Sequence, residues 1–122
     1  MATILVVDDE LLTAEMLSTF LKLIGHKSIE AYSSKQAWDK LAYTEPDAIL
    51  LDIMLPDTNG IDTCRKLRQQ NQWAKIPIII ISATAPPLTK EADDAGANAY
   101  LVKPINLQKL RTTLESVGVF KS

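Results

Sequence analysis

The sequence has little of what several common kinds of functional site require. It contains one cysteine, Cys64, and one histidine, His26. A single cysteine excludes both an intramolecular disulfide and a cysteine-based zinc site. No serine–histidine or cysteine–histidine pair is placed to suggest acyl transfer. We therefore predict that Cys64 is part of the core, and that His26, which falls in an expected turn, lies at the surface without a chemical role.

The chain also lacks a charge excess and a long apolar run. Lys and Arg number 13 against 15 Asp and Glu, a net charge of −2, which gives no support for direct nucleic-acid binding. No apolar run approaches the roughly 18 residues needed to cross a bilayer. Residues 1–3 lead at once into a strand-like run, which leaves no room for a signal peptide. We expect a cytoplasmic protein without membrane insertion.

What the chain does have is an alternation of short apolar runs with helical patterns. The predicted strands are 4–7, 27–32, 48–52, 77–82 and 99–102. The predicted helices are 12–24, a segment from a cap at Ser33 or Ser34 to 42, one marked by apolar residues at 61–67 that fades by 71, and the segments 87–95 and 107–117. Such alternation indicates an α/β fold, a doubly wound parallel sheet of five strands with five helices on its two faces.

The strand order follows from polarity and handedness. The strand at 27–32 is the most polar and suits a sheet edge. With right-handed crossovers, the order 2-1-3-4-5 of flavodoxin-like folds fits best. No repeat or linker interrupts the pattern, so we expect a single domain over residues 1–122, with a core at 3–117 and a tail or linker start at 118–122.

Polar side chains follow four of these strands. Asp8 and Asp9 follow the first, Asp52 ends the third, Ser82 ends the fourth and Lys103 follows the fifth. The carboxyl ends of parallel strands share one edge, where α/β sheets place their ligands. Each residue alone has an ordinary explanation, such as helix capping by the aspartates or a solvated surface charge for Lys103. Together they predict a site.

Three neighbouring carboxylates repel one another and raise each other's pKa values, which a divalent cation relieves. Mg²⁺ suits a site of few carboxylates, carbonyls, waters and a phosphate oxygen, and Mn²⁺ is a second candidate. Asp52 can then attack phosphorus to form an aspartyl-phosphate. The ammonium of Lys103 and the hydroxyl of Ser82 would neutralise the phosphoryl oxygens. The basic run Arg65, Lys66, Arg68 and Lys75 is typical of a solvated helix face.

The motifs Asp8-Asp9, Asp52 followed by Pro56 and Gly60, Ser82-Ala83 and Lys103-Pro104 resemble the response-regulator receiver domain of two-component signalling, in particular chemotaxis regulators, over about residues 3–117. The resemblance implies that Asp52 accepts a phosphoryl group from a phosphohistidine on a histidine kinase or histidine phosphotransfer protein. It further implies that Asp9, Asp52 and the backbone carbonyl of Met54 ligate Mg²⁺, and that Asp8 binds it through water.

The same resemblance implies a switch. Lys103 contacts the phosphoryl oxygens, Ser82 contacts them and moves on activation together with Tyr100, and the Lys103–Pro104 bond is cis, as proline permits. The output surface is the fourth helix, fifth strand and fifth helix, offered to an unidentified downstream protein. Pro86-Pro87 in the loop after the fourth strand departs from the family pattern.

Other functions remain open from the sequence. A Mg²⁺-dependent phosphohydrolase working through an aspartyl-phosphate resembles Asp-x-Asp after the strand, whereas this chain has Asp52-Ile53-Met54 and no cap insertion. A phosphorylation-independent scaffold of the same fold would not need the acidic cluster. A flavin site would require a glycine-rich loop where the chain has acids after its first strand. We therefore expect a signalling domain rather than a true enzyme, either stand-alone or part of a larger protein.

Overall fold

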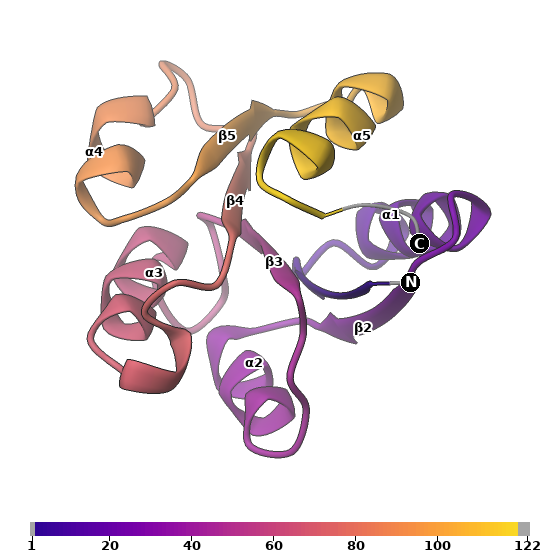
Figure 1. Ribbon diagram of the computed structural model, residues 1–122. Coiled ribbons are helices and arrows are strands. Elements are labelled where there is room, and N and C mark those ends of the chain that lie inside the picture. Colours follow the sequence, from indigo (N-terminus) through magenta and orange to yellow (C-terminus); the bar gives the residue numbers. More distant parts are fainter. Residues whose placement is uncertain (1, 120–122) are drawn as a thin grey trace.

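The computed structural model describes residues 2–119 as a parallel sheet between two layers of helices (Figure 1). The strands are β1 (Thr3–Val7), β2 (Lys27–Ala31), β3 (Ala48–Asp52), β4 (Ile78–Ser82) and β5 (Ala99–Val102). The helices are α1 (Leu11–Leu23), α2 (Ser34–Leu41), α3 (Gly60–Arg68), the 3₁₀ helix η1 (Asn71–Trp73), α4 (Thr89–Asp94) and α5 (Leu107–Ser116). The predicted α/β class is confirmed.

The sheet has the order β2-β1-β3-β4-β5, with every neighbouring pair parallel. This confirms the predicted 2-1-3-4-5 order and places the polar strand β2 at an edge. The order reverses between β1 and β3, and the crevice at such a switch point is where this class of sheet binds ligands.

Both faces of the sheet are buried, because alternate residues of each strand pack against opposite helical layers. Leu5 and Val7 of β1 belong to a core shared with α2, α3 and α4, whereas Ile4 and Val6 belong to a core shared with α1 and α5. Figure 1 shows α1 and α5 on one side of the sheet and α2, α3 and α4 on the other. Burial on both faces explains why the central strands are continuously apolar.

Most element ends match the sequence prediction. Gly25 follows α1 with a φ of 93°, a left-handed conformation that glycine adopts without strain, and the hydroxyl of Ser33 accepts the amide of Gln36 to cap α2. Helix α4 is shorter than predicted: it begins at Thr89, so Pro86 and Pro87 lie in the β4–α4 loop. The Lys103–Pro104 bond is cis, as expected, and so is Ala85–Pro86.

Two predictions about polar residues are wrong. His26 is buried, because its turn packs against the N-terminal strand, and its Nδ1 accepts the amide of Ala2 at 3.3 Å. Arg68 is not part of a solvated face. Its guanidinium donates to the carbonyls of Gly96 and Trp73, each at 2.9 Å, and so joins α3 to two neighbouring loops.

The prediction of a tail at 118–122 is only partly covered, because residues 120–122 lie outside the described part of the chain. Gly118 and Val119 follow α5, and the amide of Val119 donates to the carbonyl of Leu114. Among residues 2–119, no helix is both long and apolar enough to span a membrane.

Candidate functional site

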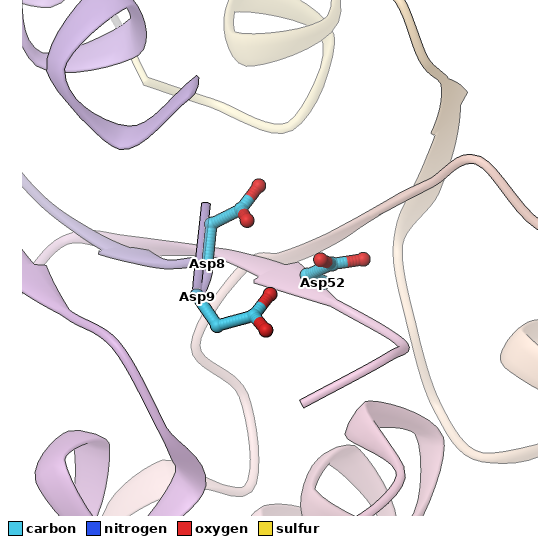
Figure 2. A group of neighbouring side chains, drawn as sticks. All are labelled: Asp8, Asp9 and Asp52. Carbon is cyan, nitrogen blue, oxygen red and sulfur yellow. The ribbon is translucent and has the colours of Figure 1, made fainter. Parts of the chain in front are cut away.

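Three carboxylates meet at the carboxyl ends of β1 and β3. Figure 2 shows Asp8 and Asp9, which follow β1, beside Asp52 at the end of β3. One carboxylate oxygen from each lies within 4.8 Å of the others. Asp8 and Asp52 are buried, whereas Asp9 is exposed. The structure thus brings together the three aspartates that the sequence singled out.

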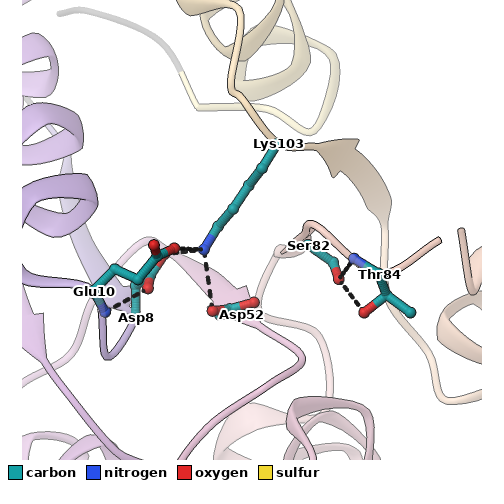
Figure 3. A network of polar contacts seen from close by, with 6 residues as sticks. All are labelled: Asp8, Glu10, Asp52, Ser82, Thr84 and Lys103. Atoms are coloured by element: carbon teal, nitrogen blue, oxygen red, sulfur yellow. Dashed lines mark hydrogen bonds and ion pairs between the residues drawn. The ribbon is translucent and has the colours of Figure 1, made fainter.

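The ammonium of Lys103 reaches into this cluster from beyond β5 (Figure 3). Its Nζ lies 2.8 Å from Asp8 Oδ2, 3.2 Å from Asp52 Oδ2 and 2.8 Å from Glu10 Oε1. The contact with Glu10 was not predicted, because an acid just before a helix is ordinary in sequence. The position of Glu10 directly after Asp9 was the one available signal. Lys103 is therefore shared by three carboxylates from two segments of the chain.

The electrostatics of the site favour a cation. Burial raises the pKa of Asp52 to about 6, the negative charge of Asp8 adds to this effect, and the charge of Lys103 opposes it. Burial acts against the charged form of Lys103, but the close contacts with the carboxylates of Asp8 and Glu10 and the charge of Asp52 outweigh this effect and raise the pKa of Lys103. One ammonium that faces three carboxylates, with Asp9 as a fourth beside them, leaves negative charge uncompensated, and the oxygen-only donor set suits a hard divalent cation.

The site opens into a cavity of about 330 Å³. Its lining combines charged side chains with mainly apolar ones: Asp9, Glu10, Asp52 and Lys103 together with Met54, Leu55, Pro56 and Ala83. A group bound above Asp52 would therefore meet both charge and hydrocarbon.

The loop after Asp52 folds tightly against the strand that carries it. The carbonyl of Ile53 accepts the amides of Leu55 at 3.2 Å and Gly60 at 2.7 Å, and Met54 pairs with Asn59 in an antiparallel bridge. The amide of Met54 donates to the Asp52 carboxylate and so favours its charged form. A Cβ on Gly60 would lie 1.9 Å from the carbonyl oxygen of Asp52, so only glycine fits there.

Gly60→Ala should therefore disturb both the fold and the site. Because the clash involves backbone, we expect a loss of about 2–3 kcal/mol in the free energy of unfolding, measured by urea titration. Gly118→Ala is the control: a Cβ at that position would have no atom within 4 Å, so the variant carries only the strain of a φ of 92°. Equal losses in the two variants, with unchanged Mg²⁺ binding by calorimetry in Gly60→Ala, would contradict the close-approach argument.

The same loop is tied to the start of α2. The carboxylate of Asp57 accepts the amides of Ser34 at 3.0 Å and Lys35 at 2.8 Å, and these contacts lower its pKa, with Lys35 contributing most. The Ser34 and Thr63 hydroxyls form a buried hydrogen bond of 2.9 Å between α2 and α3. Asp57 thus caps a helix from another element, which sequence spacing gave no means of finding.

Asp57→Ala should cost about 1–2 kcal/mol of unfolding free energy near neutral pH, the usual loss for a helix cap. Because the pKa of Asp57 is lowered in the folded state, its stabilising contribution is fully present above the ordinary value of 3.8 and is lost as the pH falls from there through the lowered folded-state pKa. Urea titrations at pH 7 and pH 3 should therefore show a smaller difference from wild type at pH 3. Asp39→Ala, which removes an exposed aspartate within α2, is the matched control.

The structure places Ser82 at the same edge but not against Asp52. Its buried hydroxyl bonds to Thr84 Oγ1 at 2.7 Å and accepts the Thr84 amide at 2.9 Å (Figure 3). The hydroxyl of Tyr100 accepts the amide of Leu88 at 3.0 Å. Thr84 and Leu88 stand at the two ends of the β4–α4 loop. Ser82 and Tyr100 are thus linked through that loop, and Thr84 is a residue the sequence did not indicate.

Comparison with known proteins agrees with this geometry. The profile of the response regulator receiver domain matches residues 4–115. The phosphate regulon transcriptional regulatory protein PhoB of Pseudomonas aeruginosa is 37% identical over 116 residues, which are 94% of this chain and 51% of that protein. The response regulator ArlR of Staphylococcus aureus is 36% identical over 118 residues, 96% of this chain and 52% of that protein. This chain spans about half the length of the curated relatives it matches.

Solved structures show the same fold. The chemotaxis response regulator CheY4 of Vibrio cholerae superposes with a TM-score of 0.89 and 30% identity, covering 96% of this chain and 98% of that one. The receiver domain of a sensor histidine kinase from Pseudomonas aeruginosa has a TM-score of 0.84 and 29% identity, covering 96% and 98%. That structure holds a magnesium ion coordinated in its active-site cleft.

Proposed function

Because this chain belongs to the family of response regulator receiver domains, we propose that it is a switch in which Asp52 accepts a phosphoryl group from a phosphohistidine on a histidine kinase or phosphotransfer protein. Domains of this family act as signalling switches in two-component systems. The observation that carries the proposal is the joint placement of a buried carboxylate, two further carboxylates and a half-buried ammonium at the switch point of the sheet. No other part of residues 2–119 gathers these groups.

The residues present fit Mg²⁺. Asp9 and Asp52 would ligate it directly, together with the backbone carbonyl of Met54, and Asp8 would bind through water. When bound, Mg²⁺ neutralises the carboxylates and the oxygens of the phosphoryl group. The fit rests on three close carboxylates and on the raised pKa of Asp52, and a related receiver domain holds magnesium in its cleft. Mn²⁺ has the same oxygen preference and would substitute.

Phosphoryl transfer needs only the phosphohistidine donor and the Asp52 carboxylate as reactants. A carboxylate oxygen of Asp52 attacks phosphorus, an O–P bond forms, and the P–N bond to the donor imidazole breaks with its electron pair passing to nitrogen. Lys103, already 3.2 Å from Asp52, donates hydrogen bonds to the phosphoryl oxygens. Met54 and Ala83 line the same cavity and offer apolar surface to the imidazole ring of the donor.

We propose that the switch acts through the β4–α4 loop. For Ser82 to bond the phosphoryl group, its hydroxyl must release Thr84 at one end of the loop. Tyr100 holds the other end at Leu88, so release changes how α4 is seated against β5. The surface of α4, β5 and α5 would then present two states to a downstream protein, with phosphorylation shifting their populations. Residues 1–122 would form one receiver domain with its core at 3–117.

Transfer from a labelled kinase tests the proposal. Incubation with autophosphorylated histidine kinase should move the label to this chain with Mg²⁺ and not with a chelator, and hydroxylamine, which cleaves acyl phosphates, should remove it. No label with any tested kinase and none with acetyl phosphate would contradict the function. Turnover of small phosphate esters far beyond one equivalent per chain would instead support the phosphohydrolase alternative.

A further inference from the structure

Three carboxylates surround the ammonium of Lys103. Its Nζ donates hydrogen bonds to Glu10 Oε1 at 2.8 Å and to Asp52 Oδ2 at 3.2 Å, and it lies 2.8 Å from Asp8 Oδ2 in an ion pair (Figure 3). A phosphoryl group on Asp52 must therefore share Lys103 with these carboxylates. The carboxylate that competes most strongly for Lys103 then affects how readily the site accepts the group.

The three carboxylates are not equivalent. Asp8 and Asp52 belong to the close cluster with Asp9 that suits a metal ion, and both are buried. Glu10 stands outside that cluster, and its side chain is 62% exposed. When a cation engages the aspartates, their hold on Lys103 weakens, whereas the charge of Glu10 remains at the mouth of the cavity.

The backbone of Glu10 is fixed while its side chain reaches across the opening. Its amide donates to Asp8 Oδ1 at 2.9 Å, and its carbonyl accepts the amide of Ala14 in the first turn of α1. The Glu10 carboxylate thus pairs with Lys103 while its backbone is held by hydrogen bonds, and both side chains line the cavity. The bond to Lys103 in turn lowers the pKa of Glu10, which keeps the carboxylate charged.

We propose that Glu10 competes with the phosphoryl group for Lys103 and so slows phosphorylation of Asp52. This inference rests on the proposed function of Asp52. Two effects act in one direction: the side chain occupies a donor that the phosphoryl oxygens need, and its charge repels an anionic donor entering the cavity. Glu10 is a positioning residue, because it acts on the reaction through Lys103.

The test compares Glu10→Gln with wild type under acetyl phosphate and Mg²⁺. Glutamine keeps the size and the acceptor oxygen of glutamate but removes the charge. We expect the phosphorylation rate to rise about fivefold, which corresponds to the usual upper strength of an exposed ion pair. Because salt screens exposed charges, this increase should be smaller at high ionic strength. Glu15→Gln, an exposed glutamate farther along α1, is the matched control and should change the rate little. A rate in Glu10→Gln equal to or below wild type would overturn the proposal.

A second readout needs neither phosphoryl group nor metal. In nitrogen-detected NMR of the metal-free protein, the ammonium protons of Lys103 should exchange with water faster in Glu10→Gln than in wild type or Glu15→Gln. Unchanged exchange would mean that Glu10 does not hold Lys103, even if the rate changed. If wild type takes up no phosphoryl group at all, the proposed function of Asp52 fails, and the exchange measurement still decides whether the ion pair exists.

Discussion

Asp52→Asn is expected to take up phosphoryl from acetyl phosphate at least about 100-fold more slowly than wild type, because an amide oxygen is a far weaker nucleophile than a carboxylate. The substitution keeps the size of the side chain, and the strand around it is fully buried. Intact-mass measurement during incubation with Mg²⁺ follows the reaction directly.

Asp57→Asn is the matched control for this experiment. It changes another aspartate on the same loop, five positions along, that points to α2 and not to the cluster. Its labelling should stay close to wild type. Undiminished labelling of Asp52→Asn would show that another residue accepts the phosphoryl group.

Lys103→Met should destabilise the metal-free protein by about 3 kcal/mol at pH 7.5, since removing one partner of a buried ion pair leaves charges uncompensated. The side chain of Lys103 is 10% exposed, and those of its partners Asp8 and Asp52 are 0% and 5% exposed. Mg²⁺ should restore much of the loss, because it replaces the missing positive charge. Urea titration with and without Mg²⁺ measures both effects.

The loss should depend on pH with a definite sign. In the metal-free fold, burial raises the pKa of Asp52 from 3.8 to about 6, so the folded state holds a proton more tightly than the unfolded state. Stability from this group is present below pH 4 and is lost as the pH rises through 6. Without the attraction of Lys103 the pKa of Asp52 rises further, so the loss of stability that accompanies its ionisation continues to higher pH. The difference in unfolding free energy between Lys103→Met and wild type should therefore become smaller as the pH is lowered from 7.5 to 5.

Lys109→Met provides the comparison, because Lys109 is exposed on α5 and forms no ion pair with the residues that the structure describes. It should change stability by less than about 0.5 kcal/mol at either pH, as is usual for surface substitutions. A pH-independent loss in Lys103→Met would mean that packing of its hydrocarbon stem, and not charge, is what the residue supplies.

The parts of the site that sequence predicts are those set by strand topology. Asp8, Asp52 and Lys103 each stand where an apolar run ends, and parallel strands end at a common edge, so their neighbourhood follows once the strand order is known. The order itself followed from the polarity of β2 and the handedness of crossovers. The same reasoning gave the burial of both sheet faces.

The parts that sequence does not predict depend on where side chains reach after folding. Glu10 turns toward Lys103, which is 93 positions away, and Asp57 reaches amides 22 and 23 positions earlier. Arg68 ties together loops that only tertiary packing brings near. His26 is buried because its turn packs on the first strand, which local polarity cannot indicate. Composition and periodicity do not predict such contacts between residues that are far apart in the sequence.

The most direct test of the account locates the acceptor chemically. The chain is phosphorylated with acetyl phosphate and Mg²⁺ and reduced with borohydride, which converts an aspartyl-phosphate to homoserine. Peptide sequencing by mass spectrometry then reads the converted position. The account predicts homoserine at position 52 alone. Homoserine at position 8, 9 or 57, or a stable phosphate elsewhere in the chain, would contradict it.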